Sequence, residues 1–124
     1  MDGVHTADKM ALTELANKLF MYCDNHDWPR LLKEVFAAEL WFDASSAGAG
    51  EPRMMKATEI CALWESGFAG MDAVHHQAGH YIIDVAGDTA AIFGYAIASH
   101  YKKAAVKGPV RTFVGSYDLK ATRV

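Results

Sequence analysis

The sequence predicts one small α+β domain, with helices mainly in the first half of the chain and antiparallel strands in the second. In the N-terminal half, apolar residues recur at steps of three and four, which is typical of helices with one buried face. The C-terminal half contains long segments of strand character separated by short turn segments. Since helices and strands do not alternate regularly, a parallel α/β fold is not expected. At 124 residues the chain has room for a single domain, 1–124.

Two helices are expected before residue 37. The first runs from Thr6 to about Asp24, and its apolar face comprises Leu12, Leu15, Ala16, Leu19, Phe20 and Cys23. We expect Asn25 to adopt the left-handed conformation that stops this helix, and Asp27 to cap the next one. Pro29 fits the first turn of that second helix, which is expected over about 28–36.

The remaining elements follow from turn residues and apolar patterning. A short strand is expected over 39–44, followed by a loop over 45–52 that is rich in Gly, Ala and Ser and is predicted to be mobile. A third helix is expected over about 56–68, ending at a turn that contains Gly70. Three strands joined by hairpins complete the sheet, at about 73–85, 89–102 and 110–121.

Composition excludes several classes of partner and compartment. Twelve basic and fifteen acidic residues are scattered along the chain and give a net charge of -3, so nucleic acid is not expected as a partner. The N-terminus lacks the pattern of a secretory signal, and no apolar run is long enough to cross a membrane, so we expect a cytoplasmic protein without membrane contact. Cys23 and Cys61 lie on apolar helix faces and are expected to be buried free thiols.

Asp24 is the first candidate for chemistry. An acid at the end of a helix faces the negative end of the helix dipole, which costs a few tenths to about 1 kcal/mol unless another group compensates. Unlike Asp27, Asp24 has no visible capping role. The pattern alone leaves two interpretations of equal weight, a solvated turn residue and a functional acid.

The run His75-His76-Gln-Ala-Gly-His80 on a predicted strand is the second candidate. Strict alternation groups His76 and His80 with Ala78, Ile82 and Asp84 on one face of the strand. Both faces are mixed, so the pattern does not indicate which one is buried. Only two of the three histidines share a face and no helical zinc motif is present, so a metal site is not expected.

His100, at the end of the next strand, shares a face with small residues, Ala90, Gly94, Ala96 and Ala98 among them. Small side chains leave space for a pocket above the sheet, although close packing of a helix would explain them equally well. On the last strand, Tyr117 shares an apolar face with Phe113 and is either a pocket hydroxyl or a core tyrosine. The same two interpretations, core or pocket wall, apply to Tyr22, Trp41 and Trp64.

Five segments together carry a resemblance to a known family: 22–31, 36–43, the histidine run 75–80, Gly-Asp-Thr-Ala at 87–90, and 115–119. In this order they resemble the SnoaL-like branch of the nuclear transport factor 2-like superfamily, over nearly the whole chain. The resemblance implies a cystatin-like, cone-shaped α+β barrel with three helices packed on a curved antiparallel sheet. These domains normally add one more strand after the point where this sequence stops, so the domain is expected without that strand.

The site residues are most similar to those of scytalone dehydratase and hexachlorocyclohexane dehydrochlorinase. In those enzymes an aspartate after the first helix orients a strand histidine, and these positions match Asp24 and His76. A second histidine of the dehydratase falls on His100. Its pocket amide falls at about Tyr117 and a tyrosine beside its aspartate falls at Cys23, so dehydration of the same substrate is not expected.

The resemblance implies a cofactor-independent lyase or isomerase, similar to a dehydratase, that acts on a small apolar cyclic substrate. His76 would be the general base, Asp24 would orient it, and His100 or Tyr117 would donate a proton or hydrogen bond. The pocket would be lined by Tyr22, Trp41, Trp64, Phe113 and Tyr117. Two alternatives remain: a non-catalytic ligand-binding or assembly module, and a hydrolase or cyclase such as an epoxide hydrolase or polyketide cyclase. No metal or cofactor is expected, and the exposed sheet face suggests a homo-oligomer, a dimer or trimer.

Overall fold

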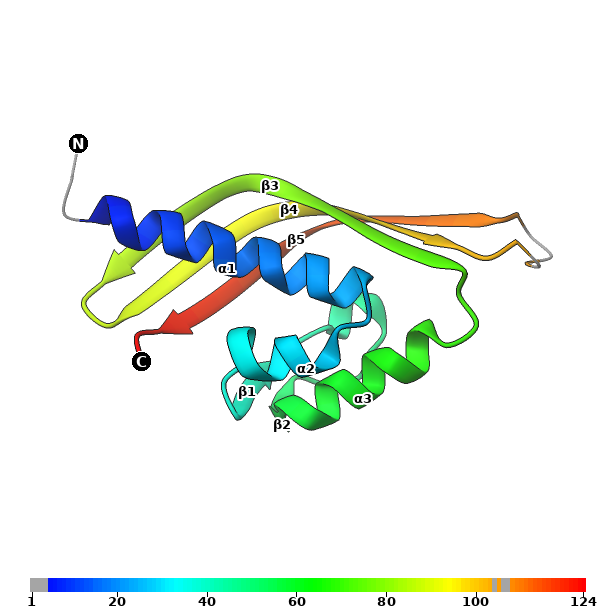
Figure 1. The fold of residues 1–124 in the computed structure, drawn as a ribbon, viewed down its shortest axis with the longest axis horizontal. Helices are drawn as coiled ribbons and strands as arrows, with labels where there is room; N and C mark the ends of the chain where they lie inside the picture. Colours follow the sequence, from blue (N-terminus) through cyan, green and yellow to red (C-terminus); the bar gives the residue numbers. More distant parts are fainter. Residues whose placement is uncertain (1–4, 104, 106–107) are drawn as a thin grey trace.

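The fold was taken from a computed structural model, which describes residues 5–103, 105 and 108–124. A strongly bent, three-stranded antiparallel sheet forms one layer, and helix α1 (Thr6–Asp24) runs along it (Figure 1). Near the C-terminal end of α1 lie the short helix α2 (Trp28–Arg30), helix α3 (Ala57–Phe68) and a small two-stranded sheet. This arrangement confirms the predicted α+β class.

The turn after α1 differs from the prediction in one residue. Asn25 keeps a negative φ of -88°, and His26 instead adopts the left-handed conformation with a φ of 55°. His26 N–H donates to the Cys23 carbonyl and Asp27 N–H donates to the Tyr22 carbonyl, which is the pairing of a Schellman motif. The residue that reverses the chain is therefore His26, because the motif requires positive φ one position later than expected.

The second helical segment begins where the sequence predicts. The side chain of Asp27 accepts a hydrogen bond from Arg30 N–H at 3.3 Å, and a proline occupies the first turn. After α2 the helix widens into one π-helical turn, Leu31–Val35, in which Phe36 N–H donates to the Leu31 carbonyl at 2.9 Å and Leu31 is fully buried. Strand β1 (Glu39–Phe42) follows and pairs with β2 (Arg53–Lys56), a strand that the sequence did not reveal.

The main sheet has the order β3-β4-β5 and consists of hairpins, as predicted. Its strands are β3 (Ala73–Ala86), β4 (Thr89–Tyr101) and β5 (Val110–Thr122). Residues paired across the sheet point to the same side. The register therefore places His100 and the predicted apolar face of β5 on the side of the sheet that carries the helices, together with the small residues of β4.

A β-bulge breaks the alternation predicted for β3. Gly79 pairs with Tyr95 and Ile82 pairs with Phe93, so His80 and Tyr81 together oppose the single residue Gly94. His80 adopts a φ of 56° and its side chain is exposed.

Because of the extra residue, the predicted grouping of His76 with His80, Ile82 and Asp84 is wrong. His76 shares the helix-covered face with Tyr81 instead, while Ile82 is 64% exposed. The Tyr81 ring lies directly over Gly94, where an added Cβ would come within 2.5 Å of its Cδ1.

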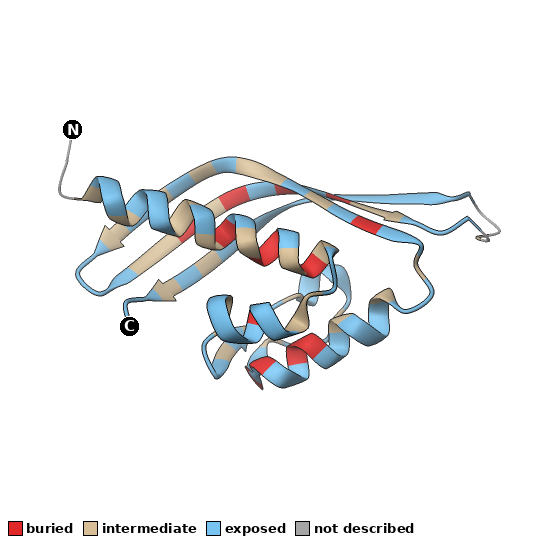
Figure 2. Cartoon of the chain, in the orientation of Figure 1, coloured by how far each residue is buried: buried red, intermediate tan, exposed pale blue. Residues whose placement is uncertain are grey.

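The buried core lies beneath the C-terminal half of α1 (Figure 2). It comprises Leu19, Phe20, Leu31, Cys61 and Ala96. Both cysteines are buried free thiols, as predicted. Among the described residues that precede Ala16, none is fully buried. The described helices include none that is both long and apolar enough to cross a membrane.

Candidate active site

Asp24 and His76 form a two-point contact where the end of α1 meets β3. The Asp24 Oδ1 atom lies 2.6 Å from His76 Nδ1, and its Oδ2 atom accepts a hydrogen bond from the backbone N–H of His76 at 2.8 Å. The two side chains are only 14% and 9% exposed. Both oxygens of one largely buried carboxylate thus hold a single histidine, which fixes the position of the residue and the orientation of its ring.

Local structure explains why this contact forms. β3 is an edge strand, so its outward-directed N–H groups have no strand partner, and that of His76 is satisfied by Asp24. Asp24 in turn lies at the unfavourable, negative end of the α1 dipole. The two hydrogen bonds from His76 compensate for the unfavourable interaction of Asp24 with the helix dipole.

The contact determines how the imidazole is protonated. A carboxylate can only accept hydrogen bonds, so Nδ1 carries the proton that it shares with Asp24. In the neutral ring this leaves a lone pair on Nε2, which is then able to accept a proton. The exposed His75 also approaches the carboxylate, with 3.8 Å between its Nδ1 and Asp24 Oδ2.

His100 lies next to His76 within a cluster of aromatic rings. The two imidazoles are 6.4 Å apart between centroids and meet edge to face. Phe68 and Phe113 contact the His100 ring at 5.7 Å and 5.3 Å. Burial lowers the pKa of His100, and the neighbouring His76 adds to this effect, so the ring is held neutral. Its Nδ1 atom is buried, and the backbone of Arg111 opposes the lowering of the pKa without cancelling it.

Two more aromatic side chains complete this cluster. Phe20 packs against His76 at 5.6 Å and meets Tyr117 edge to face at 5.1 Å. Burial raises the pKa of the Tyr117 hydroxyl, which therefore remains a proton donor at neutral pH. The neighbouring thiol of Cys23 is inert, because burial, reinforced by the charge of Asp24, raises its pKa to about 12.

The structure therefore brings together five of the predicted site residues: Asp24, His76, His100, Phe113 and Tyr117. Phe20 and Phe68 also belong to the cluster but were not proposed for it. Phe20 lies on the apolar face predicted for the first helix and Phe68 lies at the end of the third. Helical periodicity does not distinguish a core side chain from one that surrounds a functional group. His26 stacks on Phe68 with 6.0 Å between the ring centroids.

Three predicted pocket residues lie outside the cluster. Tyr22 packs against the core, and its hydroxyl donates to Glu34 at 3.3 Å. Trp64 also packs against the core and contacts Phe36 at 5.8 Å. Trp41 lies opposite Met54 in the small sheet and is 63% exposed. Tyr22 and Trp64 therefore pack as core residues, which was one of the two interpretations. Trp41 is neither core nor pocket wall, because the pairing of β1 with β2 turns it toward solvent.

The cluster is open on the side of β5, since Phe113 is 51% exposed and Tyr117 is 36% exposed. Two hollows on the described surface lie elsewhere, one beneath the first turns of α1 and one beside Tyr81. Within residues 5–103, 105 and 108–124, no three His, Cys, Asp or Glu side chains converge as metal ligands would.

Comparison with known proteins identifies the fold family. A family model described as the SnoaL-like domain matches residues 4–124. No curated protein matches the sequence. The Kfla4162 protein from Kribbella flavida superposes with a TM-score of 0.89 at 25% identity, over 95% of this chain and 82% of that one.

Two further solved structures come from Novosphingobium aromaticivorans. One is described as a candidate aromatic ring hydroxylase, with a TM-score of 0.81 and 24% identity over 95% of this chain and 80% of that one. The other is described as a candidate scytalone dehydratase, with a TM-score of 0.79 and 14% identity over 100% and 79%. At these identities the likeness establishes a shared fold.

Proposed function

The chain belongs to the SnoaL-like domain family, and on that premise we propose that it is a cofactor-independent lyase or isomerase for a small, apolar, cyclic substrate. The observation that carries the proposal is the contact between Asp24 and His76, in which both carboxylate oxygens hold one histidine. One of the solved structures that share the fold is described as a candidate scytalone dehydratase. Proton abstraction by the histidine is the chemistry that this arrangement supports best.

In the proposed reaction, Nε2 of His76 removes a proton from a carbon next to a carbonyl. The imidazolium that forms is stabilised by Asp24 through the Nδ1–H hydrogen bond, as the orienting acid does in a catalytic triad. A positioned base of this kind contributes about 10²- to 10⁴-fold. In an elimination the electron pair forms a carbon–carbon double bond as the leaving group departs, and in an isomerisation the proton returns to another carbon.

His100 and Tyr117 are the proposed electrophilic partners. Tyr117 remains protonated because burial raises its pKa, so its hydroxyl is able to donate to a developing enolate or to a leaving oxygen. The imidazole of His100, which lies edge to face with that of His76, is the second polar group that would contact a substrate. The surrounding rings of Phe20, Phe68 and Phe113 favour a flat apolar ring over a charged chain.

The proposal is tested with a panel of one- and two-ring β-hydroxy ketones, which have both an acidic C–H and a leaving group. We expect elimination, or uptake of solvent deuterium at the acidic carbon, at a rate well above that in buffer. His76→Ala and Asp24→Ala each lower this rate by about 10²-fold or more because each removes the base or its orientation. Unchanged rates in both variants would overturn the proposal.

His80→Asn provides the matched control for these variants. It removes a histidine from the same strand, but from its exposed face, and asparagine tolerates the left-handed backbone found there. Its rate stays at the wild-type level, and circular dichroism shows that all three variants remain folded. A loss of rate in His80→Asn equal to that in His76→Ala argues for a general defect in folding.

The openness of the cluster favours a second candidate, a ligand-binding module without catalysis. Calorimetry separates the two, because such a module binds the ring compounds with no exchange of the acidic proton. Incorporation of labelled oxygen from water would instead identify a hydrolase.

The outer face of the main sheet supports a proposal about assembly, a homodimer. Ile97, Tyr95 and Val114 are 48%, 56% and 78% exposed there and adjoin one another across β4 and β5. Ile97→Lys and Val114→Lys convert the dimer to monomers in sedimentation experiments. A wild-type chain that is monomeric at every concentration contradicts this assignment.

A further inference from the structure

A second region of the molecule lies about 24 Å along α1 from Asp24, since Asp8 is sixteen residues earlier on the same helix. There the first turns of α1, the β3–β4 turn and the end of β5 line a cavity of about 130 Å³ that is partly open to solvent. None of its lining residues belongs to the Asp24–His76 cluster. The cavity is therefore independent of the proposed catalytic function.

The residues of the sheet explain why space remains at this point. Val85 pairs with Ala90, and Ala90 pairs with Ala121, so these three side chains form one row across the sheet and point to the same side. Leu12 and Leu15 of α1 line the cavity opposite this row. Two alanines in the row leave empty the volume that larger side chains would fill, and none of these residues is fully buried.

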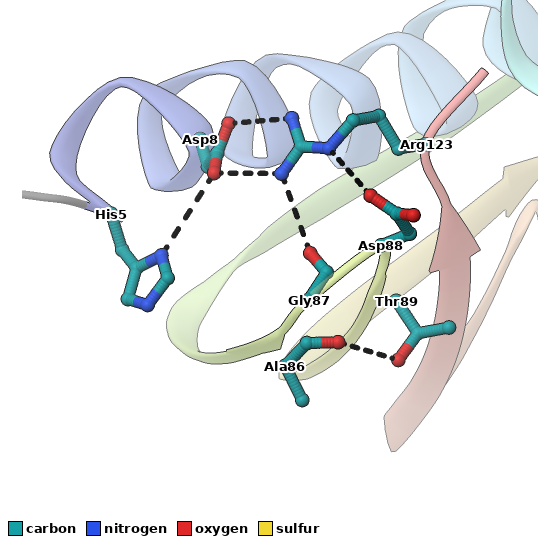
Figure 3. A network of polar contacts seen from close by, with 7 residues as sticks. All are labelled: His5, Asp8, Ala86, Gly87, Asp88, Thr89 and Arg123. Carbon is teal, nitrogen blue, oxygen red and sulfur yellow. Dashed lines mark hydrogen bonds and ion pairs between the residues drawn. The ribbon is translucent and has the colours of Figure 1, made fainter.

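Charged groups lie at the end of the cavity, and they pair with one another (Figure 3). Arg123 reaches from the end of β5 to Asp8, with two N–H···O contacts of 3.0 Å, and its Nε lies 3.4 Å from Asp88. The Thr89 hydroxyl donates to the Ala86 carbonyl at 3.1 Å. An anionic ligand would have to displace Asp8 from Arg123, so charge gives it little advantage.

We propose that this cavity is a binding site for a small, uncharged, apolar molecule of about the size of a benzene ring. The polar lining residues are Asp8, Asp88, Arg123 and two threonines, and the rest of the wall is formed mainly by leucine, valine and alanine. A water molecule needs two to four polar partners, and the apolar part of the wall offers none from its side chains. A closed apolar cavity of roughly 150 Å³ in another protein binds benzene. The present cavity is partly open to solvent but has nearly the same volume. Displacement of poorly bound water by an apolar ring favours binding.

Titration with benzene, followed through the methyl NMR signals of the protein, tests the proposal, and benzoate serves as the matched charged probe. Benzene produces saturable shifts at the methyl groups of Ala90, Ala121 and Leu12, whereas benzoate produces none at the same concentrations. The proposal is overturned if benzene gives no saturable shift at these methyls, if its shifts are confined to residues around His76, or if benzoate binds there equally well.

Substitutions that fill the cavity provide the second part of the test. Ala121→Leu places a larger side chain in the row, so the benzene shifts at Leu12 and Ala90 are lost. Ala90→Leu repeats the test from the neighbouring strand if the first variant does not fold. Ala62→Leu, an identical change at an exposed position of α3, leaves benzene binding at the wild-type level. Undiminished binding in both filling variants also overturns the proposal.

Discussion

Helix α1 carries an aspartate near each end, and each accepts two hydrogen bonds, one on each oxygen, from the same residue. Asp24 holds His76 through the ring and the backbone N–H, whereas Asp8 holds the guanidinium of Arg123. Asp24 is 14% exposed and lies beside the buried core, whereas Asp8 is 29% exposed and its partner 52%. Similar contact geometry therefore occurs in two very different environments.

Environment, rather than the number of contacts, determines what each carboxylate does. In the buried pair, little water competes for the oxygens of Asp24, so its loss leaves polar groups of His76 unsatisfied. In the exposed pair, water and salt replace the lost partner readily. The pKa of Asp8 is nevertheless lowered, chiefly by the hydrogen bond from Arg123. Four predictions examine this contrast.

The largest expected effect is on turnover, in Asp24→Asn. The amide NH₂ of asparagine donates toward Nδ1 of His76, which forces the proton onto Nε2 and removes the base. We expect kcat/KM to fall by about 10²- to 10⁴-fold with the fold retained. Steady-state kinetics measure the loss, and the deshielded Nδ1 proton disappears from the NMR spectrum. Asp8→Asn, the same change on the same helix, leaves turnover intact, and an equal loss in both variants contradicts the contrast.

The next-largest effect is on stability, and it compares the buried core with the cavity near the start of α1. Leu31→Ala removes a side chain that is 0% exposed and lowers the free energy of unfolding by about 2–5 kcal/mol. Leu12→Ala, at the cavity end, removes a half-buried side chain beside existing space and costs less, about 1 kcal/mol. Urea unfolding compares the two. Equal costs would show that the cavity end is packed as tightly as the core.

Acidification affects the stability contributions of His100 and Asp8 in different pH ranges. Burial lowers the pKa of His100 in the folded protein below its ordinary 6.5. On acidification the unfolded chain therefore binds a proton at this residue before the folded protein does. The free energy of unfolding falls as the pH drops below about 6.5, until the pH reaches the lower pKa of the folded state. The lowered pKa of Asp8 contributes stability above the ordinary 3.8, which is lost only at more acidic pH. Urea midpoints between pH 8 and pH 5 decrease in the wild type and decrease less in His100→Gln. Parallel pH profiles would show that His100 does not contribute.

The smallest effect is expected for Asp8→Asn itself. The ion pair with Arg123 is exposed, so its loss lowers the melting temperature slightly at low salt. At 1 M salt the Debye length is about 3 Å and the difference between variant and wild type disappears. Calorimetry at the two salt concentrations measures this. A large shift that persists at high salt would mean that the Asp8 end is as protected from solvent as the Asp24 end.

Much of the fold was predictable because it depends on local patterns. The boundaries of α1 and α3 follow from helical periodicity, and the three long strands follow from their turns. The bulge at His80 was not predictable, since strict alternation assumes one residue opposite one residue. β2 was missed because Arg-Met-Met-Lys does not alternate, and only its pairing with β1 makes it a strand.

For the site, the sequence indicated the residues but not their contacts. The pattern left Asp24 undecided between solvent and function, and the resemblance selected His76 over His75. That Asp24 also accepts the backbone N–H of His76 depends on β3 being an edge strand, which is a property of the sheet and not of local sequence. Trp41 shows the converse, because a strand partner that the sequence did not reveal decides which way it faces.

The hydrogen bond from His76 N–H to Asp24 has a further consequence, for solubility. An edge strand with free N–H groups is a template on which another chain adds a strand, and such additions begin aggregation. By occupying the N–H of His76 with a carboxylate and placing a helix end against it, the molecule blocks part of this edge. The residue that we propose for orienting the base therefore also protects the strand. Variants that lose Asp24 would be expected to aggregate more readily, even where their folded structure is unchanged.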